Sequence, residues 1–261
     1  MRILKRAEHD LGFRRTKNFR KDSMEAAVSY RCFYTGKLEL PESYTGLRLV
    51  LGTKAGCPVD GRKYDVFFYP MQANASGKTP LSAGLADAST ERLMVVVPHE
   101  DFHATKELRR APMTWSEAAA TLVGMATAAE VARQQFGPQS EVYQNLEREP
   151  EQFARKAALV NGYHARLRAL YEAARAGRVT ENEALAQKEQ MFAELHRQCM
   201  EIEPAPKSFS RCLAVENNAG LAFDATYTQD YPKVYQIFLS NDRDVKRSIA
   251  AIKARGGDEK P

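Results

Sequence analysis

A histidine–glutamate string near the middle of the chain has the spacing of a metal site. His99 and His103 bracket Glu100 in the string PHEDFH, which is an HExxH pattern. On a helix, residues four apart lie on one face about 6 Å apart, so both imidazoles can reach one ion. Two neutral imidazoles leave zinc with a positive charge that lowers the pKa of a bound water towards about 7, and Glu100 can accept its proton. A surface helix with two solvated histidines is the alternative, but the apolar residues at 95–97 predict partial burial, where unpartnered imidazoles are costly.

The predicted zinc site needs a third protein ligand and an open fourth position. A metzincin would carry glycine and histidine at the positions of Lys106 and Arg109, so that source of the ligand is excluded. Glu117 is a carboxylate in the first turn of a predicted helix that is otherwise almost wholly apolar. We therefore predict that Glu117 is the third ligand. Only 13 residues separate it from His103, which requires a tight connection.

Other roles for these carboxylates stay open. Thr114 and Glu117 fit a capping box, since T-x-x-E before an apolar run is the signature of that motif. A cap at this point is compatible with ligation by Glu117 only if Ser116 is the cap residue. Glu107, one turn beyond His103, and Glu130, three turns along the next helix, are weaker candidates for the third ligand.

The residues before Pro98 have the composition of strands. Short β-branched or aromatic runs alternate there with turn segments rich in glycine, proline and polar residues. The runs predict strands at 28–34, 47–51, 66–69 and 93–97, and a small, polar turn at 74–79. Proline at 98 removes a backbone donor and disfavours α conformation at the residue before it. The helix that carries the histidines is therefore expected to begin at Pro98 or to bend there.

The residues after Pro98 predict helices, because Ala, Leu, Glu, Gln, Lys and Arg recur at helical spacing to about residue 203. The predicted helices span 115–136, 151–176 and 181–200, the last two forming a hairpin at Gly177, and the segments 217–227 and 231–254 follow. We expect one α+β domain over 1–261. Its strand-rich part, 1–97, is built on a mixed or antiparallel sheet, and its mainly helical part, 98–261, carries the metal site and the hairpin.

Composition restricts the class of protein. The 261 residues, 44% of them hydrophobic and 27% charged, are typical of a globular protein rather than a disordered one. No run approaches the roughly 18 apolar residues that a membrane-spanning helix needs, so we expect no transmembrane segment. The net charge of +5 comes largely from the first 21 residues. Without an aromatic-interleaved basic groove or a zinc-knuckle spacing, this charge does not predict nucleic-acid binding.

The cysteines and the N-terminus leave the compartment open. Cys32, Cys57, Cys199 and Cys212 form no CxxC pair and so predict no zinc site, and disulfides between them need an oxidising compartment. Cys199 and Cys212 flank the proline-rich turn at 204–206 closely enough to pair, with free buried thiols as the alternative. The N-terminus is basic but lacks the apolar core of an export signal. The protein is then either cytoplasmic or a chain whose signal has been removed.

Three stretches of the chain resemble a known family. Residues 95–123, with PHEDFH followed by SEAAATLVG, resemble the predicted bacterial zinc aminopeptidases, which are gluzincin-type proteins with HExxH and a downstream glutamate in a short NE-x-x-A motif. Residues 216–227, ENNAGLAFDATY, followed by Tyr231, are similar to the C-terminal NNA-x-L…Y motif of that family, and residues 7–19 to its N-terminal LG-containing helix. The chain departs from the pattern at Ser116, where the family has asparagine.

This resemblance implies a zincin-like fold, one Zn²⁺ ion and roles for residues near the C-terminus. Tyr227 and Tyr231 are the implied donors to the oxyanion of the tetrahedral intermediate, a role that tyrosine often has in zinc peptidases. The alternative is that both are core or surface aromatics of a C-terminal helix. Asn217 and Asn218 are candidates for holding the backbone or amine of a substrate, or for capping a helix.

We therefore predict a zinc-dependent metallopeptidase that acts on a peptide or protein substrate, and the resemblance implies an aminopeptidase. Glu100 is the predicted general base towards the zinc-bound water and later the acid towards the leaving amine. The alternative is a zinc-binding scaffold or binding protein of the cell envelope without turnover. The resemblance implies the periplasm or cell envelope if a signal has been removed. The sequence leaves open the native metal, the oligomeric state, and whether the enzyme is an exopeptidase or an endopeptidase.

Overall fold

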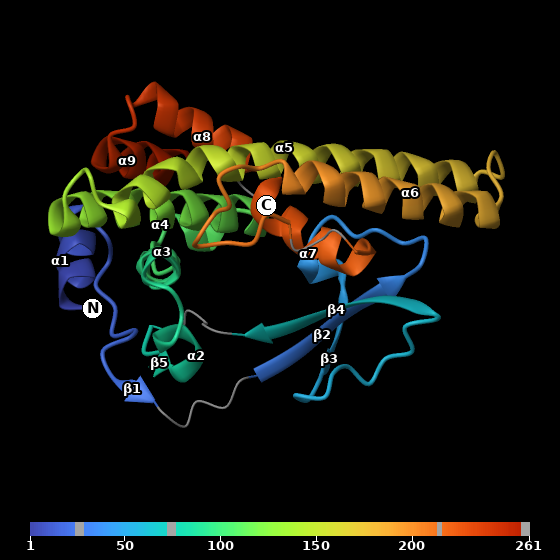
Figure 1. The fold of residues 1–261 in the computed structure, drawn as a ribbon, viewed down its shortest axis with the longest axis horizontal. Coiled ribbons are helices and arrows are strands. Elements are labelled where there is room, and N and C mark those ends of the chain that lie inside the picture. Colours follow the sequence, from blue (N-terminus) through green and yellow to red (C-terminus); the bar gives the residue numbers. More distant parts are fainter. Residues whose placement is uncertain (24–28, 72–76, 213–215, 257–261) are drawn as a thin grey trace.

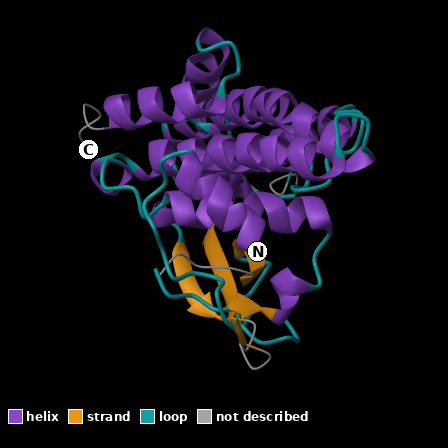
Figure 2. Ribbon diagram, turned by 90° about the vertical axis from the view of Figure 1, so that its left-hand side faces the viewer, coloured by secondary structure: helices purple, strands orange, loops and turns teal. Residues whose placement is uncertain are grey.

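A layer of helices covers a small sheet in the computed structural model, which describes residues 1–23, 29–71, 77–212 and 216–256 (Figure 1). Helices α4 (Met113–Phe136), α5 (Glu141–Arg175) and α6 (Glu181–Met200) run along the long axis of the molecule. Helix α7 (Asn218–Thr228) contacts both α5 and the sheet. Figure 2 shows the same two layers from the side. The arrangement confirms the α+β class, with mostly helical content.

The main sheet is antiparallel and has the strand order β3-β2-β4. Its strands are β2 (Ser29–Gly36), β3 (Arg48–Leu51) and β4 (Tyr64–Met71), which confirm three of the predicted strands. Val28 and residues 74–76, which belong to a predicted strand and a predicted turn, lie outside the described residues. Two short strands, β1 (Asp22–Ser23) and β5 (Leu81–Ser82), pair in parallel beside this sheet.

The strand predicted at 93–97 is wrong, because these residues lie inside helix α3 (Thr90–Phe102). All five side chains from 93 to 97 are at least partly buried, so their continuous apolar run reflects a helix covered on most sides. Periodicity cannot distinguish such a helix from a buried strand. Ser89 caps the helix by accepting a hydrogen bond from the amide of Arg92. The helix therefore begins two turns before Pro98, and the prediction that it begins at Pro98 is also wrong.

The first 97 residues are less strand-rich than predicted, because they also contain α1 (Arg2–Asp10), α2 (Ala83–Ala86) and the 3-10 turn η1 (Tyr44–Gly46). Helix α1 includes only residues 7–10 of the segment 7–19 that the resemblance gave as a helix. It is tied to α3 through Asp101, a buried carboxylate that accepts hydrogen bonds from Lys5, from the Thr16 hydroxyl at 2.6 Å and from the Asn18 amide at 2.8 Å. The N-terminal segment thus buttresses the helix that carries the two histidines.

The helical part agrees closely with prediction. Helix α4 ends at Gly137, whose positive φ of 84° favours glycine, and α6 matches the predicted bounds. Helix α5 begins ten residues earlier than predicted and continues through Pro150, because Ser140 caps it. The predicted segment 231–254 is two helices, α8 (Tyr231–Ser240) and α9 (Val245–Gly256). Residues 242 and 243 separate them with left-handed φ angles of 55° and 59°.

Two disulfides join segments of the chain. Cys32 on β2 pairs with Cys57, and Cys199 in the last turn of α6 pairs with Cys212. The second pairing decides between the two alternatives left open for Cys199 and Cys212, a bridge across the turn at 204–206 and free buried thiols. Among the described residues, no helix has the length and apolar character that crossing a bilayer requires.

Candidate metal centre

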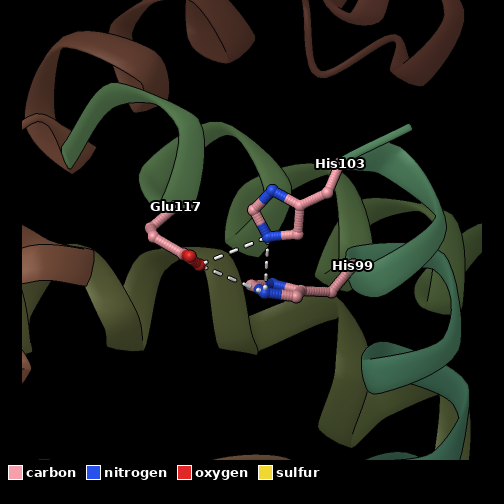
Figure 3. Close-up of side chains that lie close together, drawn as sticks. All are labelled: His99, His103 and Glu117. Atoms are coloured by element: carbon pink, nitrogen blue, oxygen red, sulfur yellow. Dashed lines mark hydrogen bonds and ion pairs between the residues drawn. The ribbon is translucent and has the colours of Figure 1, made fainter. Parts of the chain in front are cut away.

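Two histidines and a glutamate from the neighbouring helices α3 and α4 point at one another (Figure 3). The Nε2 atoms of His99 and His103 are 3.3 Å apart. The Glu117 Oε2 atom lies 3.4 Å from the His99 Nε2 and 3.3 Å from the His103 Nε2. These three side chains form a group that could hold a metal ion. The two histidines and the third ligand predicted from the sequence are thus brought together.

Local helix geometry places the three side chains. His99 lies in the last turn of α3 and His103 is the residue that ends the helix, so the two rings lie on one face, a turn apart. The chain then turns through η2 (Leu108–Arg110), and Pro112 starts α4 at Met113. This 3-10 turn is the tight connection that the short spacing required. Glu117 follows in the second turn of α4 and faces back towards α3.

The alternative roles of the nearby carboxylates are resolved by the structure. No side chain caps α4, and the Thr114 hydroxyl donates to Asp230 Oδ2 at 2.6 Å, so Thr114 and Glu117 form no capping box. Ser116 is inside the helix and is not its cap. Glu130 instead accepts hydrogen bonds from Arg133 and Gln134 of its own helix. Neither Glu130 nor Glu107 belongs to the group found among the described residues.

Two neighbours of the group were missed by sequence reasoning. The Ser116 hydroxyl lies 3.3 Å from His103 Nδ1, so it can fix the ring orientation from the side opposite Nε2. Gly124 on α4 faces α3, and a Cβ atom there would lie 2.8 Å from the Val95 carbonyl oxygen and 3.1 Å from His99 Cβ. The missing side chain lets the two helices approach closely. The only signal in the sequence was a serine next to Glu117 and a glycine inside a predicted helix.

Burial and mutual charge set the protonation of the group. Burial would raise the pKa of Glu117, but hydrogen bonds from His103 and His99 hold this pKa at about 2. Burial lowers the pKa of His103, yet its hydrogen bond to Glu117 gives a net rise. Burial raises the pKa of Glu100, and the two histidines oppose the rise only in part. Glu117 is thus the ionised, anionic member of the group, as a metal ligand must be.

Two cavities meet at these residues and share His99, Glu100 and Tyr227. The first, about 470 Å³, lies between α3, α7 and β4, and its apolar walls include Val95, Val96, Phe67, Phe153, Phe209 and Phe223. A buried ion pair, Lys156 to Asp224 at 3.0 Å, also lines it. The second, about 380 Å³, adjoins His103 and Glu117. Glu100 thus faces open space on both sides of the histidines. We call these spaces the aromatic cavity and the arginine cavity, the second because Arg31 and Arg109 line it.

The two tyrosines implied by the resemblance lie in different surroundings. Tyr227 lines both cavities, and its ring centroid is 6.4 Å from that of His99. Its hydroxyl has no hydrogen-bond partner within the described part of the chain, and burial raises its pKa well above the ordinary value. Tyr231 is fully buried and donates its hydroxyl to the Pro150 carbonyl at 3.0 Å, away from both cavities. The structure brings Tyr227 to the histidines but not Tyr231.

Asn217 and Asn218 join α7 to the sheet. Asn217 caps the helix by accepting from the Gly220 amide at 3.1 Å, and its own amide donates to the Val66 carbonyl. Asn218 is fully buried and donates to the carbonyls of residues 37 and 39, while its oxygen accepts from the Tyr171 hydroxyl at 2.8 Å. Neither residue lines the two cavities. Capping of a helix, the alternative role for these residues, is therefore present at Asn217. The side-chain amides of both residues donate to backbone carbonyls and are not available to a substrate.

Comparison with known proteins adds one result. Residues 75–260 match the model of a family described as "Putative aminopeptidase". This match covers more than two thirds of the chain, from the segment before α2 to the end of α9, and includes His99, His103 and Glu117. No curated protein and no solved structure matches the chain.

Proposed function

The chain belongs to the "Putative aminopeptidase" family, and from this premise we propose that it is a zinc-dependent peptidase. In this proposal His99, His103 and Glu117 bind one zinc ion, and Glu100 is the general base. The family supports peptidase activity, and the geometry of the three side chains supports the metal. The finer classification as a zincin-like fold of the gluzincin type is also part of the proposal, supported by the HExxH string on α3 and the glutamate on α4.

The triangle of ligand atoms is the observation on which the proposal depends most. Its edges are 3.3, 3.3 and 3.4 Å. An ion about 2.0–2.1 Å from each of three atoms at tetrahedral angles separates these atoms by about 3.3–3.4 Å. The three edges thus match the spacing that a zinc ion would need, and two imidazoles with one carboxylate form the donor set of many catalytic zinc sites.

A buried atom of the group also lacks the partner that a metal would provide. Glu117 is 8% exposed, and its Oε2 faces the two imidazole nitrogens at 3.3 and 3.4 Å without a hydrogen bond of good geometry among the described residues. Contacts this long compensate a buried, ionised oxygen only in part. A cation bound at the centre of the triangle would satisfy this oxygen and both Nε2 atoms at once.

The residues around the triangle suit peptide hydrolysis. Zinc held there would lower the pKa of a water molecule towards about 7 and polarise the peptide carbonyl. Glu100 takes one proton from the attacking water as the oxygen bonds to the carbonyl carbon. Glu100 then passes that proton to the nitrogen as the C–N bond breaks, which leaves a carboxyl group and an amine. Tyr227, whose hydroxyl has no protein partner among the described residues, is positioned beside His99 to donate a hydrogen bond to the carbonyl oxygen.

The aromatic cavity supports a preference for peptides with an apolar side chain next to the bond that is cut. Burial of an apolar side chain against its phenylalanine and valine walls would stabilise the bound peptide by about 25 cal/mol per Å² of apolar surface. The disulfides support a further part of the proposal, that the protein works in an oxidising compartment such as the periplasm or cell envelope.

Metal analysis and a peptide digest test this function together. The purified protein should contain about one zinc per chain and should cleave a mixed peptide library, as read by mass spectrometry. Glu100→Gln should abolish cleavage and retain zinc, whereas Glu117→Gln should lose both. Glu107→Gln is the matched control, because Glu107 lies on the same connection but outside the metal-binding group.

Two results would contradict the proposal. A wild-type protein that binds zinc but leaves every peptide intact would favour the zinc-binding envelope scaffold. Full activity in Glu100→Gln would show that another group moves the proton.

A further inference from the structure

The arginine cavity contains Arg31, a cation that no group of the described residues neutralises. Arg31 lies on β2, directly opposite Tyr69 of β4, so both side chains stand on the same face of the sheet. The neighbour of Arg31 on that face is Phe33, whose ring packs against Phe223 of α7. Arg31 thus projects on the side of the sheet that faces α7, and it lines the cavity together with His103 and Glu117.

Arg31 is a partly buried residue, and its guanidinium has no ion-pair or hydrogen-bond partner within the described residues. The cations of the aromatic cavity differ in this respect. Lys156 is paired with Asp224, and Arg92 donates to the Ser208 carbonyl at 2.6 Å. A guanidinium cannot lose its proton at physiological pH, and partial burial without a partner is costly. An unpaired arginine in a cavity beside a candidate metal centre therefore indicates a ligand with a negative charge.

The positive charge of Arg31 acts on the pKa of two tyrosines that line the arginine cavity. Burial raises the pKa of Tyr44 to about 12 and Glu117 adds to the rise, while the positive charge of Arg31 opposes it. Tyr69 follows the same pattern, because burial raises its pKa and Arg31 is among the cations that oppose the rise. The Arg31 guanidinium is thus close enough to the hydroxyls of both tyrosines to act on them.

The balance of charge in the cavities favours an anion over an ammonium. The carboxylates that line them are Glu100, Glu117 and Asp224, and the last is already paired with Lys156. The first two belong to the proposed catalytic group and cannot also hold a substrate amine. Arg31 and the exposed Arg109 line the arginine cavity, and a divalent ion held by Glu117 would add to the positive charge there.

We infer that Arg31 binds a carboxylate of the substrate, and that this contact selects peptides with an acidic group on one side of the bond that is cut. The planar guanidinium fits a carboxylate through two parallel hydrogen bonds, a geometry that lysine does not offer. The carboxylate is either the C-terminus of a short peptide or an Asp or Glu side chain. This inference rests on the proposed peptidase function and adds the substrate class.

Three matched peptides separate the two sources of the carboxylate. The first is an apolar peptide that ends in an amide and has no acidic residue, the second is the same peptide with a free C-terminal acid, and the third is the amide with one glutamine replaced by glutamate. The wild-type protein should cleave the second or third peptide with a kcat/KM at least about tenfold above that of the first, mostly through a lower KM. The peptide that gains identifies the source.

Substitutions at Arg31 complete the test. Arg31→Gln should remove the preference, and Arg31→Lys should recover part of it, since lysine keeps the charge but loses the two-point geometry. Arg48→Gln is the matched control, because Arg48 is an exposed arginine of the same sheet that lies opposite Tyr34, on the other face. The Arg48→Gln protein should prefer the carboxylate peptide as strongly as the wild type does. Equal rates on all three peptides, or a preference that survives in Arg31→Gln, would overturn the inference.

A binding measurement distinguishes failure of this inference from failure of the proposed function. Calorimetry of the same peptides with the Glu100→Gln protein reads affinity without turnover. Tighter binding of a carboxylate peptide, lost on combining Glu100→Gln with Arg31→Gln, supports the inference even if the wild type cleaves nothing. Equal affinity for all three peptides refutes it, whether or not the wild type is a peptidase.

Discussion

The contact between α3 and α4 at Gly124 offers the sharpest test of how the fold positions the metal-binding group. Alanine there would place its Cβ 2.8 Å from the Val95 carbonyl oxygen and 3.1 Å from His99 Cβ. Carbon–oxygen contacts are ordinarily no closer than about 3.3 Å, and carbon–carbon contacts favour about 3.5–4.0 Å. Helix α3 must therefore move by about 0.5 Å, and His99 moves with it, whereas Glu117 stays on α4.

The shift has consequences for both stability and metal affinity. Overpacking of this kind costs about 1–3 kcal/mol, partly offset by about 1 kcal/mol from the better helix propensity of alanine. The net loss of up to about 2 kcal/mol would lower the melting temperature by up to about 8 °C in a chain of this size. A functional site needs its side chains within about 0.5 Å of their productive positions. A shift of His99 by this amount should therefore lower the affinity for zinc about tenfold.

Thermal unfolding and chelator competition measure the two effects in Gly124→Ala. The matched control is Gly162→Ala on α5, where an added Cβ meets no atom within 4 Å. That exposed helical site should gain about 0.5–1 kcal/mol of stability and keep the wild-type zinc affinity. A Gly124→Ala protein that gains as much stability as Gly162→Ala would refute the packing argument. A protein that is less stable but binds zinc as tightly as the wild type would refute the link from helix spacing to the metal-binding group.

Three further perturbations follow from contacts around the group. Ser116→Ala should weaken zinc binding about tenfold in the same competition assay, because His103 loses the partner of its Nδ1; an unchanged affinity would show that the serine does not orient the ring. Asp101→Asn should lower the free energy of unfolding in urea by about 2 kcal/mol, since three donors of the N-terminal segment meet that carboxylate, and the surface variant Asp60→Asn should leave the urea midpoint in place. Removal of the Cys32–Cys57 bridge, which closes a span of 25 residues, should cost about 3 kcal/mol by the same measurement, and an equal midpoint for the variant and the wild type would contradict its stabilising role.

Patterns that depend on near neighbours in the chain were predictable. The spacing of His99 and His103 fixes their relation on any helix, so the pair could be predicted without knowing what the helix packs against. The helices α4 and α6 were also predicted closely, because glycine and capping residues end helices through local backbone conformation and local hydrogen bonds. Glu117 was predicted as the third ligand on a weaker basis, its charge in an apolar helix, and the structure places it at the histidines.

Other features depended on which segments of the chain meet. Residues 93–97 have the composition of a strand, but they lie inside helix α3, where the rest of the core buries them. Tyr227 and Tyr231 lie four residues apart in one resembling motif, yet only Tyr227 reaches the cavities, since a turn between α7 and α8 sends Tyr231 into the core.

The sequence by itself determined the helical spacing of His99 and His103 and the place of Glu100 beside them, because these follow from relations within one turn of the chain. Only the tertiary structure decided how close α3 and α4 lie at Gly124, which hydroxyl meets His103, and that Arg31 from a distant strand shares a cavity with Glu117. Contacts between segments far apart in sequence depend on the packing of whole helices and sheets, and short-range spacing carries no record of them.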